Sequence, residues 1–249
     1  MHIIACIKQV PRDNTVAIDA HKRIDASGIE PILNLFDEYA LEAALSLNDE
    51  HGGDVTVLSL GTDETVDQLR RSLAMGATNA VLVTADGEPD IASAVSIVRS
   101  AIGTLPAADV IVCGRTATDD ESAAFGPMLA QALGWTHVTY VTKILSSTAT
   151  TLELERSLED ETEVVSVPLP VLISVGKGEV EPRFPSLLRV RKYAKAEVPV
   201  IAAAAFTNVA SVVDRIPPAA RKAGEIIAGP DVASKVRTLV DRLIADQAL

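Results

Sequence analysis

The chain has 249 residues, of which 48% are hydrophobic and 3% aromatic, and 22 Lys+Arg against 34 Asp+Glu give a net charge of −12. This composition excludes a wholly disordered chain, and the length suits one large α/β domain or a core with an appendage. The negative charge argues against general binding to nucleic acid or to an anionic membrane, because it repels their phosphates. A small nucleotide remains possible.

The amino-terminal segment "MHIIACIKQVP" has a short apolar run before Lys8. That run is too short for a signal peptide or a membrane span. Cys6 and Cys113 each lie in an apolar strand pattern and do not form a metal-spaced pair, so we expect two buried thiols of a reducing compartment. The sequence thus predicts a chain without stable membrane insertion, in the cytoplasm or, alternatively, in the mitochondrial matrix.

Apolar strand patterns alternate with helical periodicity through the first half of the chain. The strands are expected at 2–8, 54–61, 80–86 and 109–114, and the helices begin near Asp37, Glu64, Asp90 and Pro127. Strands that alternate with helices indicate βαβ units and a parallel sheet. The expected fold class is α/β, a three-layer Rossmann-like parallel sheet of the adenine nucleotide-binding (HUP-like) kind.

The pattern changes after Trp135. Period-two alternation and β-branched residues over 137–178 predict antiparallel strands or a hairpin, appended to the sheet as an edge or lid. The Pro-, Arg- and Lys-rich stretch 182–199 predicts a projecting arm, and an amphipathic helix is expected at 231–249. The chain therefore divides into a nucleotide-binding α/β domain, 1–195, and a C-terminal arm and helix, 196–249.

Several common catalytic motifs are missing from the sequence. It has no GxGxxG, no GxxxxGK[ST] and no GxSxG, and its four histidines are scattered. The standard dinucleotide fingerprint, P-loop, hydrolase and metalloenzyme interpretations therefore lose their usual support. The turn "LGTDE", with Leu60 and Gly61, ends a strand and starts a helix, so its backbone N–H groups could face a phosphate or a ribose. It could equally be an ordinary turn that connects a strand to a helix and binds no ligand.

The stretch "GRTATDDESAAFGPMLAQALGW" (114–135) is the more informative turn. Gly114 frees the backbone, Thr116, Thr118 and Ser122 supply hydroxyls, and Gly126-Pro127 marks a helix start with unpaired N–H donors. The acids of 119–121 would repel a phosphate unless they point away, so backbone donors would have to bind an anion. The alternative is that these acids merely cap the helix.

Five segments, in the same order, resemble the β subunit of electron transfer flavoprotein. They are "IKQVP" (7–11), "NLFDEYALEAA" (34–44), "LRRSLAMGATNAVLV" (69–83), residues 114–135 and "LPVLISVGKGEVEPRFPSL" (169–187). The resemblance covers about residues 1–195 and is loose beyond. It implies a heterodimer with a larger α subunit that holds most of one FAD. The flavin would take electrons from flavin dehydrogenases such as the acyl-CoA dehydrogenases of fatty acid oxidation.

The resemblance also implies a set of cofactor-binding residues. Asn34 would line a nucleotide site and Phe36 the flavin face, although a Phe at this place is more often core. An AMP would be held by the end of the first strand, the turn after the second and the acid-rich loop. The set is Ala5, Lys8, Asn34, Phe36, Leu60, Gly61, Gly114, Thr118, Asp119, Asp120, Glu121, Ser122, Ala123, Ala124, Phe125 and Gly126.

The acid-rich loop leaves two cofactors open. Asp120 matches the AMP form of the family, whereas Ser122, Ala123 and Gly126 lean to the electron-bifurcating form, which carries a second FAD and accepts hydride from NADH; Ala124 departs from both. The lack of Gly at position 120 favours AMP, because a side chain disfavours positive φ. With AMP, the chain would carry no bond chemistry, no catalytic residue and no metal, and the nucleotide would stabilise the fold.

The arm corresponds to the family's partner-recognition loop, whose Leu anchor falls on Leu187. Arg183, Arg189 and Arg191 would steer an acidic partner such as a dehydrogenase. Alternatively, Leu187 and Leu188 pack on the α subunit. If the resemblance misleads, the same βαβ pattern suits a stand-alone adenine-nucleotide sensor of the universal-stress type, which would need no larger partner.

Overall fold

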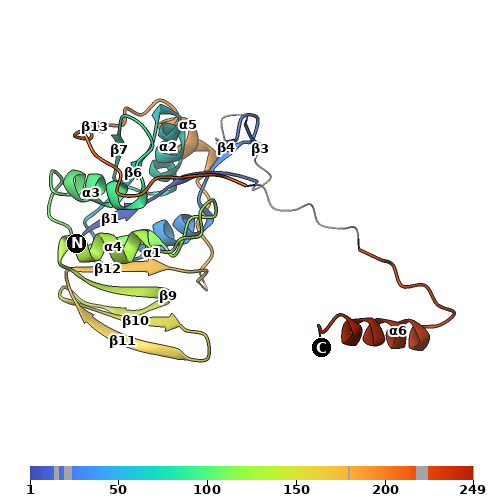
Figure 1. The fold of residues 1–249 in the computed structure, drawn as a ribbon. Coiled ribbons are helices and arrows are strands. Elements are labelled where there is room, and N and C mark those ends of the chain that lie inside the picture. Colours follow the sequence, from blue (N-terminus) through green and yellow to red (C-terminus); the bar gives the residue numbers. More distant parts are fainter. Residues whose placement is uncertain (14–16, 20–23, 179, 217–223, 249) are drawn as a thin grey trace. The chain divides into compact units, whose positions relative to one another are not determined.

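The computed structural model describes residues 1–13, 17–19, 24–178, 180–216 and 224–248 (Figure 1). It divides into two compact units, Met1–Val213 and Asp214–Leu249, each described by itself below. The first unit contains the sheet and all the cofactor-binding residues expected from the sequence. The segment 217–223 of the expected C-terminal arm lies outside the described residues.

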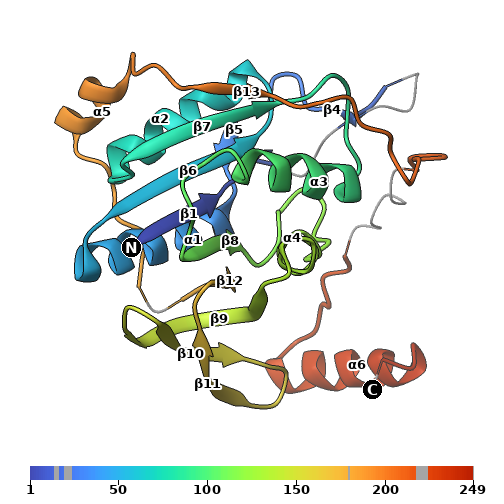
Figure 2. The same ribbon diagram turned by 90° about the vertical axis from the view of Figure 1, so that its left-hand side faces the viewer.

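A nine-stranded sheet forms the centre of the described part of the first unit, in the order β11-β10-β9-β12-β8-β1-β6-β7-β13 (Figure 2). Every neighbouring pair from β9 to β13 along this order is parallel. These strands are β1 (His2–Cys6), β6 (Asp54–Leu60), β7 (Asn79–Thr84), β8 (Val110–Gly114), β9 (Thr136–Ser147), β12 (Val171–Val175) and β13 (Val200–Ala202). The predicted parallel α/β sheet is therefore confirmed.

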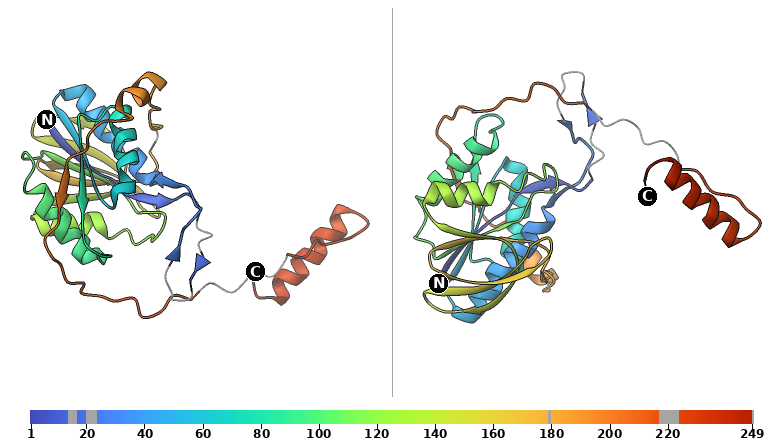
Figure 3. Two further views of the ribbon diagram at one scale, coloured as in Figure 1. Left: turned by 90° about the horizontal axis from the view of Figure 1, so that it is seen from above. Right: turned by 60° about the horizontal axis from the view of Figure 1, so that its bottom comes forward.

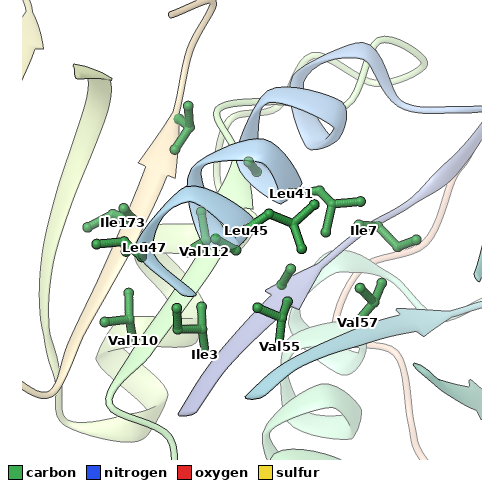
Figure 4. Close-up of a cluster of buried hydrophobic side chains, with 14 of the residues drawn as sticks. Ile3, Ile7, Leu41, Leu45, Leu47, Val55, Val57, Val110, Val112 and Ile173 are labelled. Atoms are coloured by element: carbon green, nitrogen blue, oxygen red, sulfur yellow. The ribbon is translucent and has the colours of Figure 1, made fainter. Parts of the chain in front are cut away.

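Helices cover both faces of this sheet (Figure 3). Alternate residues of β1 separate the two layers, because Ile3 and Ala5 pack with α1 and α2 while Ile4 and Cys6 pack with α3 and α4. Figure 4 shows the aliphatic packing of α1 against the strands. The helices are α1 (Leu35–His51), α2 (Val66–Met75), preceded by the 3-10 turn η1 (Asp63–Thr65), α3 (Ile91–Ile102), α4 (Phe125–Leu133) and α5 (Leu187–Tyr193).

The expected antiparallel extension is present, but it is smaller than predicted. Strands β10 (Thr151–Ser157) and β11 (Thr162–Pro168) continue from β9 in antiparallel order. The prediction was wrong for β12, which lies inside the sheet, between β8 and β9 and parallel to both. All five residues of β12 are buried, and a continuous apolar run of this length is typical of a strand covered on both faces.

Two short ribbons lie before α1. Strand β2 (Gln9–Pro11) pairs with β5 (Pro31–Leu33), and β3 (Ala17–Ile18) pairs with β4 (Ile24–Asp25), both antiparallel. The first ribbon continues directly from the end of β1 and returns the chain to the start of α1. It thereby places Asn34, whose backbone N–H donates to the carbonyl of Lys8 at 2.9 Å, beside that strand end.

The division at residue 195 that the sequence predicts stays a prediction. The first compact unit of the structure runs to Val213. Strand β13 pairs with β7, and beyond it the N–H groups of Val209 and Ala210 donate to the Asp90 carboxylate. In the second unit, α6 (Val232–Ala245) agrees with the predicted amphipathic helix. Asp231 and Ser234 form a capping box that starts it.

Candidate functional site

A cavity of about 410 Å³ opens at the carboxyl ends of β1, β6 and β8. Its wall combines these strand ends with the beginnings of α1, α3 and α4. Open α/β sheets bind ligands at this edge, because the strands end there and the loops that follow can vary freely. The cavity is mostly apolar with a few polar groups, as small-molecule sites are.

Most residues expected to bind a nucleotide line this first cavity. They are Lys8, Asn34, Leu60, Gly61, Gly114, Asp120, Ser122, Ala123, Ala124 and Phe125. The others of the acid-rich loop, Thr118, Asp119, Glu121 and Gly126, are not part of the wall. Ala5 is not part of it either, since its side chain belongs to the core on the α1 face, and its neighbour Cys6 forms the wall instead.

The acid-rich loop carries its own counter-charge. The Lys8 ammonium lies 2.8 Å from Asp119 and 3.2 Å from Asp120. Burial alone would lower the pKa of Lys8, but hydrogen bonds and the charges of both acids raise it above its usual value. Lys8 therefore compensates part of the charge of the two carboxylates within the chain, and a phosphate would meet less repulsion than the sequence suggests.

The same loop has a strained backbone. Glu121 and Ala123 have φ of 49° and 52°, the left-handed region that residues with a Cβ rarely adopt. Local hydrogen bonds stabilise this backbone conformation, including the bond from the Ala123 N–H to the Thr116 hydroxyl at 3.3 Å. Such strain concentrates at ligand sites. The acids do not cap the following helix, because the N-cap of α4 is Ala124 and no side chain caps it.

The first turn of α1 anchors the root of this loop. The Asp37 carboxylate is buried and accepts hydrogen bonds from the N–H groups of Lys8 at 2.7 Å and Gly114 at 2.9 Å. Burial raises the pKa of Asp37 to about 7. Gly114 is required at this contact, since a Cβ there would meet the carboxylate at 2.2 Å. Asp37 was not singled out in the sequence, where it is one of two acids in the first turn of α1.

A second cavity, of about 980 Å³, contains Phe36 on its wall. Phe36 is half-buried and belongs to neither core cluster, so the core interpretation of this residue is wrong. The Arg115 guanidinium lies between two rings, 4.9 Å from Phe36 and 5.4 Å from Tyr140. Arg115 also lines the first cavity, so one residue borders both. The residues 157–161 and Lys177 form most of the opposite wall.

Tyr140 reaches Arg115 through an irregularity of β9. Its φ is 60°, and the pairing of β9 with β12 shifts register between Ile173 and Val175. A bulge of this kind turns a side chain away from the direction that strict alternation would give it. Neither Arg115 nor Tyr140 was singled out in the sequence, because the alternating pattern cannot reveal a bulge.

The arm residues expected to meet a partner fall into two groups. Arg183 pairs with the buried carboxylate of Glu42 at 2.7 Å and with Asp49 at 2.9 Å. Arg189 donates to the carbonyls of Leu73 and Ala74 at the end of α2. These two arginines therefore hold the arm on α1 and α2. The exposed group comprises Phe184, Leu187, Leu188, Arg191 and Lys192, with Leu187 78% exposed.

The two cysteines are buried, as expected. Cys6 and Cys113 are register partners on β1 and β8, and burial raises the pKa of Cys6 to about 12 and that of Cys113 well above its usual value. The described residues contain no cluster of His, Cys, Asp or Glu suited to a metal ion. In the same part of the chain, every helix is too short or too polar to cross a bilayer.

The fold and the first cavity define a Rossmann-like α/β protein with a small-molecule site at the strand ends. Residues 23–206 match the model of the electron transfer flavoprotein domain. The electron transfer flavoprotein subunit beta of Thermoanaerobacterium thermosaccharolyticum is 35% identical over 98% of both chains. Protein FixA of Azorhizobium caulinodans is 36% identical over 80% of this chain and 74% of its own, and the subunit beta of Clostridium acetobutylicum is 38% identical over 76% and 74%.

The chain therefore belongs to the electron transfer flavoprotein β-subunit family. This membership removes the stand-alone nucleotide sensor as an alternative.

Proposed function

We propose that this chain is the β subunit of a heterodimer that shuttles electrons through FAD between flavin dehydrogenases, such as acyl-CoA dehydrogenases, and a downstream acceptor. AMP occupies the first cavity. The observation that carries the proposal is the pair of cavities on either side of the first turn of α1, with Asn34 on the wall of one and Phe36 on the wall of the other. We propose the cytoplasm as its cellular location, in keeping with the bacterial relatives.

The lining of the first cavity fits an adenine nucleotide. Leu58, Leu60 and Val98 provide apolar surface for a base, and Asn34 holds the loop at Thr116 and Thr118 beside it. Backbone N–H groups at the uncapped start of α4 and the positive charge of Arg115 suit a phosphate, while Lys8 compensates part of the charge of Asp119 and Asp120. AMP in this place would stabilise the native chain, since it binds the folded state alone.

The second cavity fits one side of a flavin ring shared with an α subunit. FAD supplies the electron-transfer chemistry when it is bound. The chain's own contribution would be the aromatic surface of Phe36 and the positive charge of Arg115, which favours negative charge on a neighbouring ring. The acids at 159–161, on the other wall, oppose that effect and so tune it.

Two exposed apolar surfaces suit protein partners. The docking patch, Phe184, Leu187 and Leu188 with Arg191 beside it, has the small apolar anchor and basic rim that a transient complex with an acidic dehydrogenase needs. The α6 helix exposes Val232, Val236, Leu239 and Ile244, and we propose that it packs on the α subunit.

The second candidate is the electron-bifurcating form, with a second FAD in the first cavity and NADH as hydride donor. One observation favours it: Arg115 lines both cavities, so ligands in them would border a common residue. Asp120 counts against it less than expected, because its φ is not positive and the strained residues are Glu121 and Ala123.

Nucleotide content tests these alternatives. The chain is co-expressed with the α subunit of its own organism, the purified heterodimer is denatured in acid, and the released FAD and AMP are quantified. One FAD and one AMP per heterodimer support the shuttle. Two FAD, with reduction of the flavin by NADH, support the bifurcating form, and a heterodimer without FAD contradicts both.

A further inference from the structure

The carboxylate of Asp37 is the most enclosed charged group at the first cavity. It is 5% exposed and lies in the first turn of α1. Each of its oxygens accepts one backbone N–H, from Lys8 beyond the end of β1 and from Gly114 at the end of β8. One side chain therefore fixes the spacing of two strand ends and of the helix that follows them.

Asn34 continues the same contact along the loop. Its side-chain N–H donates to the Thr116 carbonyl at 2.9 Å, and its side-chain oxygen accepts the Thr118 N–H at 3.1 Å. Together, Asn34 and Asp37 make four hydrogen bonds to the segments that border the cavity. We call this set the α1 clamp. It holds the root of the loop that carries Asp120, Ser122 and Ala123 on the cavity wall.

The charged and titratable neighbours of Asp37 leave its charge poorly compensated. The Lys8 ammonium is engaged by Asp119 and Asp120, so Lys8 reaches Asp37 mainly through its backbone N–H. Cys6 on β1 and Cys113 on β8 are the other titratable neighbours, and their raised pKa values keep both thiols neutral around pH 7. Arg115 follows Gly114 but lies over the ring of Phe36.

We propose that Asp37 is a positioning residue of the nucleotide site, which keeps the α1 clamp in its binding geometry only while its carboxylate is ionised. This inference rests on the proposed nucleotide site. Protonation turns one carboxylate oxygen into a hydroxyl and removes the negative charge, so the two buried N–H groups keep only weaker, uncharged acceptors. The pKa of about 7 places this change within the neutral range. The loop root loosens and nucleotide affinity falls as the pH falls.

Simple charge repulsion makes the opposite prediction. An ionised Asp37 repels a phosphate, so its protonation would strengthen binding if the carboxylate acted through its charge alone. The direction of the pH dependence thus separates a positioning role from a purely electrostatic one.

The test is calorimetric titration of AMP into the nucleotide-stripped heterodimer between pH 6 and pH 8.5. The wild type is expected to bind AMP about tenfold more weakly at the low end, the equivalent of one lost buried hydrogen bond. Asp37→Asn places an NH₂ against one of the two donors and should bind weakly at every pH, without the wild-type slope. AMP changes its own charge near about pH 6, but equally for every variant.

Two variants keep the test interpretable. Glu38→Gln removes a charge from the same turn, from a side chain that pairs with Arg71 outside the cavity, and should keep the wild-type profile. Asn34→Ala breaks the other half of the clamp and should weaken binding at every pH. It should also move the pH dependence to higher pH, because the Asn34 side chain hydrogen-bonds the Asp37 carboxylate and lowers its pKa. Circular dichroism and thermal unfolding of each variant show whether it is folded.

Normal wild-type affinity with a flat profile, or with tighter binding at low pH, would overturn the positioning role and leave the nucleotide site standing. Wild-type affinity in folded Asp37→Asn would do the same. Failure of the wild type to bind AMP at any pH would overturn this inference together with the proposed AMP site.

Discussion

The strand-end site, which is the first cavity and its border, differs from the docking patch in whether its side chains have partners within the chain. At the strand ends, backbone N–H groups bond the buried Asp37 carboxylate, and Lys8 pairs with Asp119 and Asp120 of the same chain. At the docking patch, Phe184 and Leu187 are 88% and 78% exposed. The proposed function accounts for this difference: a nucleotide site would need groups held in place before the ligand binds, whereas exposed apolar side chains would be covered by another protein.

The largest effect is expected from Gly114→Ala, which breaks the strand-end site from within. The new Cβ would lie 2.2 Å from an Asp37 oxygen and 2.8 Å from the Phe36 carbonyl carbon, so α1 must move. We expect a loss of about 3 kcal/mol in the free energy of unfolding and no measurable AMP binding. Urea unfolding and calorimetry measure both.

Gly103→Ala is the matched control, since its nearest new contact is an ordinary 3.4 Å and its φ is −62°. It should leave both quantities unchanged. AMP binding in Gly114→Ala at wild-type strength would mean that α1 does not need to approach β8 closely.

The next effect tests the division of the arm into anchoring and exposed residues. Arg183 lies in the Pro-, Arg- and Lys-rich arm, but its guanidinium pairs with the buried carboxylate of Glu42. Arg183→Ala leaves the Glu42 carboxylate, which is 7% exposed, without its cation. The expected cost is about 2 kcal/mol, below that of a fully enclosed pair because Arg183 is partly solvated. Arg191→Ala, on the exposed side, should cost nothing measurable. Equal unfolding free energies for the two variants would refute this division.

A smaller effect is expected at the docking patch itself. Leu187→Ser should change the free energy of unfolding by less than about 0.5 kcal/mol, because the side chain is already solvated. It should raise the KM for the electron-donating dehydrogenase about tenfold, as the loss of an apolar anchor does. Steady-state reduction of the heterodimer by acyl-CoA dehydrogenase measures this KM. A large loss of stability with unchanged KM would instead make Leu187 a structural residue.

The smallest effect concerns Arg115, which joins the two cavities. Arg115→Lys keeps the charge but loses the planar stack between Phe36 and Tyr140, worth about 0.5–1 kcal/mol. We expect a two- to fivefold weaker AMP affinity and a shifted FAD absorption spectrum in the same protein. Lys177→Arg, which changes a cation on the second cavity alone, should alter the spectrum without altering AMP affinity. An unchanged spectrum in Arg115→Lys would remove Arg115 from the flavin side.

The local features of this structure could be predicted from the sequence. Apolar runs and helical periodicity predicted β1, β6, β7 and β8 with their helices, because these patterns depend on neighbouring residues. The same alternation could not tell which face of β1 the ligand meets, and a shift of one residue separates Ala5, in the core, from Cys6, on the cavity wall.

Long-range features were out of reach for a different reason. Arg183 and Glu42 are 141 residues apart, and a basic residue in a basic segment gives no sign of a buried partner. The place of β12 was equally hidden, since an apolar run indicates a covered strand but not its neighbours. Arg115 and Tyr140 meet through a bulge that no periodicity predicts.

The insertion of β12 has a consequence for how the molecule is made. Strand β9 is bonded to β10 and β12, so within the described sheet the β9–β11 segment joins β8 only through β12. A chain growing on the ribosome therefore cannot join these two parts of the sheet until residue 175 has emerged. Phe36 and Arg115 belong to the part that contains α1 and β8, and Tyr140 belongs to the β9–β11 part. The wall that would face the flavin is thus assembled late in synthesis, after the strands around the first cavity are complete.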